Sequence, residues 1–382
     1  MILARDFRLI RTPISLPILA FVIMAFISSV FSMDRWYSFD EFRGEVLKQA
    51  MLFLMVANTI RNRKQIRNLL IGLFTGAAFM SIVGIVGYYT GLTVYEGRTI
   101  SWYSNMSYTS LGCYLAINVT LVLAIVYFER NRARIFWLLS MTAVLAWCIL
   151  LTFTRGVWIA VGIAGSFLSV ARKKFIGLLV LAMMIFVLAV FPNPFRERLL
   201  SIADLRNYPV SGAILSDRVL SWQSALDMIK DRPLIGIGYG PKLFEEIYPQ
   251  YVYPGAKEPM SYAHNLFLDL TVQMGIPGLI IFFWLIISYF RGAIIVFRKV
   301  SSSFLRAVIL GSITGILILL VNGLVSLLLF NELGLLIFIL MGITYSRAIQ
   351  VECGLMELNH LPQKVASRLV ASVQTKNVDA LH

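Results

Sequence analysis

Charged side chains are scarce in this chain. They account for 14% of its 382 residues, whereas a typical soluble domain has about a quarter, and 58% of the residues are hydrophobic. The mean hydropathy is +0.78. This composition excludes an ordinary soluble domain. It predicts an all-α polytopic membrane protein whose core is a helix bundle embedded in the bilayer.

Cysteine and histidine are also rare, with three of each. Cys113 and Cys148 lie in apolar segments and Cys353 lies near the C-terminus, so the sequence indicates neither a disulfide framework nor a metal site. Two of the histidines belong to the polar C-terminal tail. The third, His264, lies where a long polar loop meets an apolar segment, which makes it a candidate site residue.

Acidic residues are fewer than basic ones, and the net charge is +14. Such a charge would suit a nucleic-acid-binding protein, but the basic residues stand in short clusters between apolar runs. This distribution excludes nucleic acid as a partner and indicates contact with membrane lipid instead.

About ten apolar runs are long enough, or nearly long enough, to cross a bilayer. The first follows Arg5, Arg8 and Arg11, and no small-residue cleavage site ends it, so we interpret it as a retained helix rather than a signal peptide. The runs are approximately 14–31, 46–60, 68–90, 108–127, 135–153, 157–171, 175–191, 275–297, 307–330 and 333–347.

The positive-inside rule orients these predicted helices. One set of alternate connections, which begins with the N-terminus, carries 17 basic residues, whereas the opposite short connections carry five. We therefore expect a multi-pass membrane protein with both termini cytoplasmic. It divides into N-terminal membrane helices (1–191), a loop on the outer side of the membrane (192–262), C-terminal membrane helices (263–347) and a cytoplasmic tail (348–382).

The outer loop contains predicted structure of its own. Ser216 is a candidate N-cap of a helix that ends at Asp231-Arg232-Pro233. Its apolar positions Val219, Trp222, Leu226 and Ile229 fall on one face. A flexible glycine-rich turn follows at 236–240, and then a second short amphipathic helix at 242–248. Tyrosines alternate with prolines from 248 to 262, a pattern that suits carbohydrate stacking, the membrane interface or ordinary loop packing alike.

Three groups on the predicted outer side have useful chemistry. Arg155 lies between two apolar helices, Arg218 lies in the first turn of the loop helix, and His264 follows the loop. Arginine forks bind a diphosphate bidentately, and a neutral histidine accepts a proton from a hydroxyl near neutral pH. The plainer alternatives are an interfacial anchor for Arg155, a solvated surface arginine for Arg218 and a locally hydrogen-bonded His264.

The chain resembles the O-antigen ligase/polymerase superfamily of bacterial membrane glycosyltransferases over roughly residues 100–345. Three motifs in a fixed order carry the resemblance: Thr154-Arg-Gly-Val-Trp158; Asp217-Arg-Val-Leu-Ser-Trp222 with Pro233-Leu-Ile-Gly-Ile-Gly238; and Ala263-His-Asn-Leu-Phe-Leu268 with Gly275-Ile-Pro-Gly278. The element Ser104-Asn-Met-Ser-Tyr108 departs from the Asn-Pro-Asn-like pattern that the family usually has there, which leaves the role of Asn105 open.

The resemblance implies transfer of a glycan from undecaprenyl diphosphate to an acceptor hydroxyl at the periplasmic face, without metal, cofactor or nucleotide sugar. By motif, Arg155 and Arg218 resemble the arginines that hold the diphosphate, and His264 resembles the catalytic base. Trp222, Tyr239, Tyr262 and Asn265 are candidate contacts to the glycan or the acceptor. The absence of an Asp-x-Asp motif agrees with metal independence.

Within the superfamily we favour an O-antigen ligase, whose acceptor is a sugar of the lipid A core, over an O-antigen or exopolysaccharide polymerase. A protein oligosaccharyltransferase is related, and a lipid-linked glycan transporter is the alternative from another class. A transporter would not require a loop of about seventy residues that carries site residues, and transporters commonly contain internal repeats, which this sequence lacks.

Overall fold

A computed structural model shows a helical protein and describes residues 11–95, 97–100, 107–172, 214–253, 260–326, 329 and 331–354. Two short strands, β1 (Val94–Tyr95) and β2 (Arg98–Thr99), pair antiparallel. The helices are α1 (Ser15–Val30), α2 (Arg35–Glu41), a π-helical turn (Phe42–Leu47), α3 (Lys48–Thr59), α4 (Arg63–Thr90), α5 (Tyr108–Phe128), α6 (Arg132–Leu151), α7 (Arg155–Arg172), α10 (Ile214–Asp231), α11 (Pro241–Ile247), a 3₁₀ turn (Tyr248–Gln250), α12 (Leu266–Lys299), α13 (Ser303–Gly323), α14 (Asn331–Thr344) and α15 (Arg347–Glu352).

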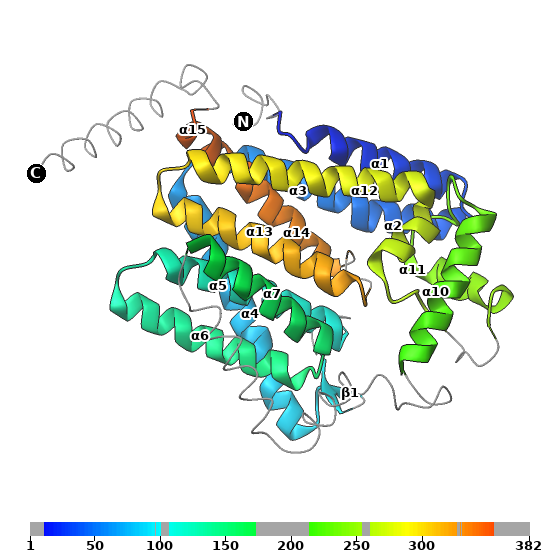
Figure 1. The fold of residues 1–382 in the computed structure, drawn as a ribbon, viewed down its shortest axis with the longest axis horizontal. Helices are drawn as coiled ribbons and strands as arrows, with labels where there is room; N and C mark the ends of the chain where they lie inside the picture. Colours follow the sequence, from blue (N-terminus) through cyan, green and yellow to red (C-terminus); the bar gives the residue numbers. More distant parts are fainter. Residues whose placement is uncertain are drawn as a thin grey trace, which may run out of the picture.

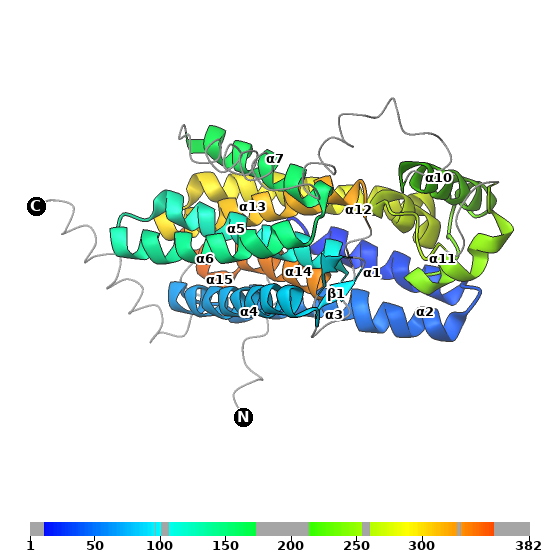
Figure 2. The same cartoon turned by 90° about the horizontal axis from the view of Figure 1, so that it is seen from below.

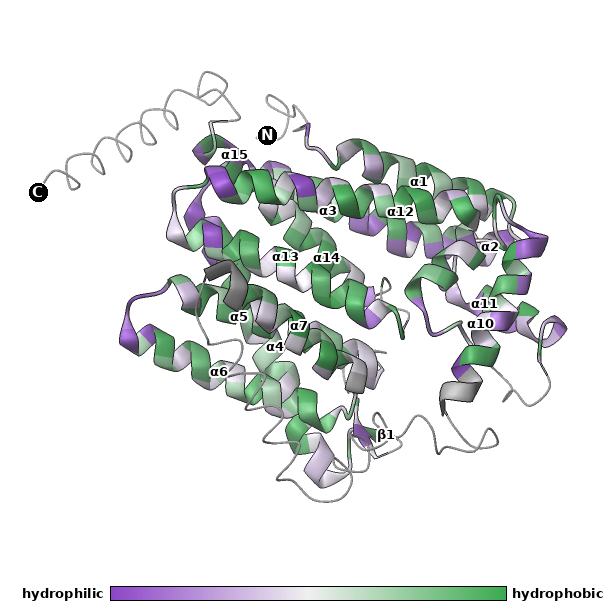
Figure 3. Ribbon diagram, viewed as in Figure 1, coloured by the Kyte–Doolittle hydropathy of each residue, from purple (hydrophilic) through white to green (hydrophobic). Residues whose placement is uncertain are grey.

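The long helices run side by side and form the bundle that the hydropathy predicts (Figure 1). Helix α5 packs against α6, α7 and α13, while α1 packs on α12 and α3 packs on α14. Most residues of α5, α13 and α14 are buried, whereas fewer than half of the residues of α4, α6 and α12 are buried. Hydrophobic residues dominate the middle of the bundle and hydrophilic residues gather at its two ends (Figure 3). This distribution is the one a bilayer-embedded bundle requires.

Six helices in the described part of the chain are long and apolar enough to cross a membrane: α4, α5, α6, α12, α13 and the continuous segment 331–352. The predicted spans 14–31 and 157–171 form shorter apolar helices, Ser15–Val30 and Gly156–Leu168, and 46–60 forms α3, which has 12 residues. The predicted span 175–191 lies outside the described residues. A polytopic helical bundle is therefore confirmed.

Short polar residues fix where several helices begin. The side chains of Asn62, Ser107 and Asn131 accept hydrogen bonds from the backbone N–H groups three residues further on, at the first turns of α4, α5 and α6. These bonds satisfy donors that a helix start leaves without an intrahelical partner. Each cap lies at the boundary between a polar connection and an apolar run, which is why the sequence pattern located these helices well.

Helix α12 starts earlier than the apolar run predicts, at Leu266 rather than near residue 275. The helix is interrupted at Gly275, whose φ of 68° lies in the left-handed region that favours glycine. At this break the N–H of Ile276 donates to the carbonyl of Pro233 over 2.8 Å. The first turns of α12, which follow His264, therefore lie at an angle to the rest of the helix.

The glycine-rich segment 236–240 packs against the break in α12, and it is not the flexible turn that its composition predicts. The N–H groups of Ile237 and Gly238 donate to the carbonyls of Val272 and Gln273, and the N–H of Gly240 donates to the side chain of Gln273. Helices α2, α10 and α11 consequently gather at one end of the bundle, in both views (Figures 1 and 2).

At the opposite end of the bundle, one carboxylate holds two helix connections together. Glu352 of α15 accepts from the guanidinium of Arg63, with a shortest distance of 2.7 Å, and from the backbone N–H of Ser302 at 2.9 Å. The connections α3–α4 and α12–α13 are therefore tied to α15. Most of the basic clusters counted above, those around 61–67, 130–134 and 291–306, belong to the ends of the helices at this side.

Candidate functional site

His264 occupies a strained position directly before α12. Its φ is 53°, a left-handed conformation that is uncommon for a residue other than glycine. The next residue, Asn265, is the N-cap of α12, and its side-chain oxygen accepts from the N–H groups of Phe267 and Leu268. The histidine is thereby held at the N-terminal end of the helix, as its motif suggests.

The carboxylate of Asp269 holds the residue on the other side of His264. Asp269 Oδ1 accepts from the backbone N–H of Ala263 at 2.8 Å, and the N–H of Asp269 donates to the carbonyl of Asn265 at 2.8 Å. Asp269 and Ala263 are buried. We call this set, Ala263 to Asn265 bonded to Asp269, the Asp269 clamp.

The imidazole of His264 is partly buried and lies next to two side chains with distinct chemistry. Its ring centroid is 4.3 Å from that of Tyr262. Burial, and in second place the positive charge of Arg218, lower the pKa of His264 to about 4. Burial also raises the pKa of Tyr262, against the opposing charge of Arg218. The histidine is therefore neutral at pH 7 and able to accept a proton.

Helix α10 brings Arg218 to the histidine. Ser221 and Ser224 are buried on the face of α10 that packs inward, and their hydroxyls donate to the carbonyls of Tyr262 and Tyr251. The loop segment just before His264 is thus bonded to the helix that carries Arg218. In sequence, Arg218 precedes Ser221 by a single helical turn.

The structure differs from the predicted loop helix in two details. Ile214 already belongs to helix α10, so Ser216 lies inside the helix and is not its N-cap. The predicted apolar face is buried only in part: Trp222 and Ile229 pack against a buried cluster, whereas Val219 and Leu226 are exposed, and Ala225 and Met228 are buried beside the two serines. The serine hydroxyls find backbone acceptors in the loop, and this long-range pairing outweighs the apolar periodicity. The second helix and the stop after Asp231 are confirmed.

The start of α7 lies close to the same place. A β-carbon on Gly156 would lie 2.6 Å from the side-chain oxygen of Asn322, so only glycine permits this approach of α7 to α13. Two residues further along, the carbonyl of Leu324 accepts from the side chain of Asn265. The backbone of Arg155, at the first position of α7, therefore lies near the N-cap that holds His264. The side chain of Arg155 lies outside the described part of the structure.

The remaining candidate contacts occupy different environments. Tyr262 and Asn265 flank His264, and Trp222 lies partly buried one turn from Arg218 on α10. Tyr239 is 2% exposed, and it lines a small internal cavity together with Gln49 and apolar residues of α1, α12, α13 and α14. The structure therefore does not bring Tyr239 to the histidine. Asn105 lies outside the described residues.

Sequence reasoning did not identify three residues near the histidine. Asp269 holds the backbone beside it, and its position in the first turn after an Asn cap was a readable signal. Tyr108, at the start of α5, interacts electrostatically with Tyr262, and the guanidinium of Arg98 lies 4.3 Å over the ring of Tyr108. No sequence motif links Arg98 on β2 with Tyr108, because only the fold brings them together.

The arrangement combines a neutral base with positive charge at one end of a membrane bundle. Arg218 supplies a permanent charge beside His264, and Arg155 lies in the first turn of α7, where the helix dipole favours an anion. Such a site is suited to binding an anionic group while a proton is removed from a neighbouring hydroxyl.

Comparison with known families agrees with this chemistry. Residues 141–283 match the O-antigen ligase family, a segment that runs from α6 into α12 and includes Arg155, Arg218 and His264. No curated protein matches the chain. The match supports the superfamily that the three ordered motifs predict.

Proposed function

Because the chain is a membrane protein of the O-antigen ligase/polymerase superfamily, we propose that it transfers a glycan from undecaprenyl diphosphate to an acceptor hydroxyl. The observation that carries the proposal is the juxtaposition of a neutral His264 with Arg218 at the end of the bundle where α7 begins. Undecaprenyl diphosphate is an anionic carrier buried in lipid by its tail. A cationic site at the end of a membrane helix bundle is the place where its head group would lie.

In the proposed reaction, His264 accepts the proton of the acceptor hydroxyl as the acceptor oxygen attacks the anomeric carbon of the glycan. The bond from that carbon to the phosphate oxygen breaks, and undecaprenyl diphosphate leaves with the electron pair. Arg218 and Arg155 would stabilise the negative charge that develops on the leaving group. The donor is already activated, so no further energy source is needed.

Donor binding would also prepare the base. The charge of Arg218 is one of the two causes that lower the pKa of His264. A diphosphate bound to Arg218 would offset that charge and raise the pKa of His264 towards the value of an ordinary histidine. A base of higher pKa accepts a proton more readily, so the histidine would become effective after the donor binds.

We propose a lipid A core sugar as the acceptor, hence an O-antigen ligase, with the site on the periplasmic side of the inner membrane. The clustering of basic residues at the opposite end of the bundle supports this orientation. Cysteine at Leu234, which is exposed next to the docked loop, should react with an impermeant thiol reagent in intact spheroplasts. Cysteine at the exposed Lys64 should not, and labelling of Lys64→Cys from outside would reverse the orientation.

The direct test is transfer by the purified protein in detergent with an undecaprenyl-diphosphate glycan as donor. Lipid A core and a second carrier-linked glycan are offered as separate acceptors. We expect transfer to lipid A core in excess EDTA, without ATP or an ion gradient. Extension of the carrier-linked glycan instead would make the protein a polymerase. Activity that EDTA abolishes and Mg²⁺ restores would contradict the metal-independent mechanism, and a requirement for a membrane potential would point to transport.

A further inference from the structure

The backbone around His264 is tied to α12 on both sides of the histidine. Before it, the N–H of Ala263 donates to Asp269 Oδ1 at 2.8 Å. After it, Asn265 caps the helix and its carbonyl accepts from the N–H of Asp269. His264 itself, between these two fixed residues, has the unfavourable φ of 53°. A single residue of the helix, Asp269, thus forms bonds on both sides of the strained position.

A carboxylate is not needed there merely to begin the helix. Asn265 already satisfies the N–H groups of Phe267 and Leu268. Asp269 Oδ1 reaches instead to an N–H that lies outside the helix, while its Oδ2 is buried and has no hydrogen-bond partner within the described residues. A buried carboxylate with an unpaired oxygen destabilises a fold, which points to a role of Asp269 beyond capping the helix.

We propose that Asp269 is a positioning residue, which holds His264 in the left-handed conformation that presents its imidazole beside Arg218. This inference rests on the proposed role of His264 as the base. Asp269 acts through its hydrogen bond to the backbone N–H of Ala263. It is not a cause of the lowered pKa of the imidazole, which comes from burial and from the charge of Arg218. Releasing the N–H of Ala263 would let His264 relax to an extended conformation and move the ring away from the acceptor hydroxyl.

The first measurement is the separation of kcat from KM in purified variants. Asp269→Ala removes the acceptor, and we expect kcat to fall by roughly 10- to 100-fold because the base is misplaced, with the KM for the donor nearly unchanged. Asp269→Asn keeps an oxygen that can accept from Ala263, and its kcat should remain within about threefold of the unchanged protein. Asp269→Leu fills the same space without an acceptor and serves where the alanine variant does not accumulate.

The second measurement does not depend on glycan transfer. Diethylpyrocarbonate modifies neutral histidines, and mass spectrometry separates His264 from the two tail histidines. We expect the modification of His264 to be roughly tenfold faster in Asp269→Ala or Asp269→Leu, since the loop opens more often, and slow in Asp269→Asn. If the unchanged protein transfers no glycan, this result still tests the clamp, and only the proposed function fails.

Glu45→Ala provides a matched control. Glu45 is another buried carboxylate that accepts a backbone N–H, from Asn331, whose φ is 56°. Its loss should leave both kcat per folded molecule and the modification rate of His264 unchanged. Unchanged kcat and modification rate in Asp269→Leu would overturn the proposal. Equal losses in Asp269→Asn and Asp269→Leu would show that the charge, rather than the bond to Ala263, is required, and would overturn it too.

Discussion

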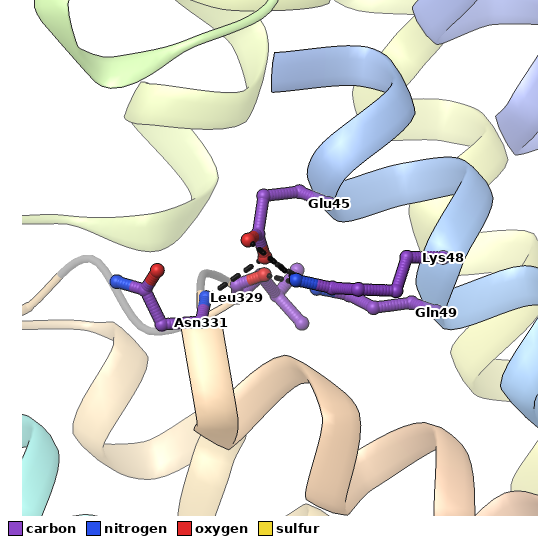
Figure 4. A network of polar contacts seen from close by, with 5 residues as sticks. All are labelled: Glu45, Lys48, Gln49, Leu329 and Asn331. Atoms are coloured by element: carbon purple, nitrogen blue, oxygen red, sulfur yellow. Dashed lines mark hydrogen bonds and ion pairs between the residues drawn. The ribbon is translucent and has the colours of Figure 1, made fainter. Parts of the chain in front are cut away.

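Two buried carboxylates in this bundle hold the backbone next to a left-handed residue, and they do so differently. Glu45, in the π-helical turn before α3, accepts from the N–H of Asn331, from Gln49 and from Lys48 (Figure 4). Gln49 in turn donates to the carbonyl of Leu329. We call this set the Glu45 network. Asp269 accepts from Ala263, and one of its oxygens has no partner among the described residues.

The difference separates a structural joint from a candidate site. In the Glu45 network both carboxylate oxygens are hydrogen-bonded, and the result is a fixed start for α14 against α3. A fully satisfied buried network adds rigidity and little else. The Asp269 clamp fixes a histidine instead and leaves acceptor capacity unused. Incomplete satisfaction of buried polar groups is tolerated where the backbone has a task beyond folding.

The largest expected effect, and the strongest test of the difference between the two carboxylates, is the loss of the imidazole of His264. We expect His264→Ala to reduce kcat for glycan transfer by about 10²–10⁴-fold, because a positioned base contributes that much to rate. Donor binding should remain nearly unchanged, since Arg218 still carries its charge. The measurement is single-turnover transfer together with donor binding on the purified variant. Normal transfer at normal protein level would remove His264 from the mechanism and leave the Asp269 clamp without a functional reason.

A smaller effect is expected at Arg218. Arg218→Ala should weaken binding of the donor by about 10- to 100-fold, the range for a lost hydrogen bond to a charged group. Arg218→Lys should restore part of the affinity, because lysine keeps the charge and lacks the planar fork. Titration with undecaprenyl diphosphate measures both. Arg232→Ala is a matched control, because Arg232 lies just beyond the end of α10, and it should leave the affinity unchanged. Equal affinity in the alanine variant of Arg218 would contradict its proposed role.

The helix bundle could be predicted from the sequence because each helix is determined by residues that are close together in the chain. Apolar runs, polar caps such as Asn62 and Ser107, and clusters of basic residues all lie next to one another in the chain. The candidate site rests on a different kind of signal, namely three sequence motifs. The three motifs named Arg155, Arg218 and His264, and the fold brings the backbone of the first and the side chains of the other two to one end of the bundle.

The parts that the sequence did not predict depend on distant pairing. Tyr239 follows a glycine and reads as an accessible aromatic, but the segment 236–240 docks on the break in α12 and buries it. The inward face of α10 carries serines because carbonyls of the later loop lie opposite them. The Asp269 clamp depends on the left-handed backbone conformation of His264, which no residue pattern in the chain predicts.

The pH dependence of transfer should follow the lowered pKa of His264. Above about pH 4 the free protein holds a neutral histidine, so kcat/KM should stay level well below the pH at which an ordinary histidine becomes protonated. In Arg218→Gln one of the two causes is removed and burial remains. The acid limb of kcat/KM should then move to higher pH, at reduced overall activity. An acid limb that is already near pH 6.5 in the unchanged protein would contradict this account of the site.

The same shift has a consequence for stability, with a defined sign. The unfolded chain protonates His264 near pH 6.5, whereas the folded protein does so near pH 4, so the unfolded state binds more protons in between. The free energy of unfolding should therefore rise with pH from about 4 to 6.5, and His264→Gln should flatten that rise. Thermal unfolding in detergent across this range measures it. An equally steep rise in both proteins would assign the dependence to other groups.

The smallest expected effect on activity belongs to the Glu45 network, which serves as the structural counterpart of the Asp269 clamp. Glu45→Ala leaves the N–H of Asn331 without its acceptor and removes one of the two hydrogen bonds that the amide of Gln49 donates, which should lower the free energy of unfolding by about 1–3 kcal/mol for each bond lost. Glu45→Gln keeps one acceptor oxygen and should lower it less. Because Glu45, Gln49 and Asn331 bond to one another and to the carbonyl of Leu329, at the start of α14, kcat per folded molecule should not change in either variant. A network that stabilises the bundle without affecting transfer, beside a clamp that affects transfer more than stability, would establish that the two carboxylates serve different purposes. A loss of kcat in Glu45→Gln would instead mean that the start of α14 is coupled to the histidine end of α12.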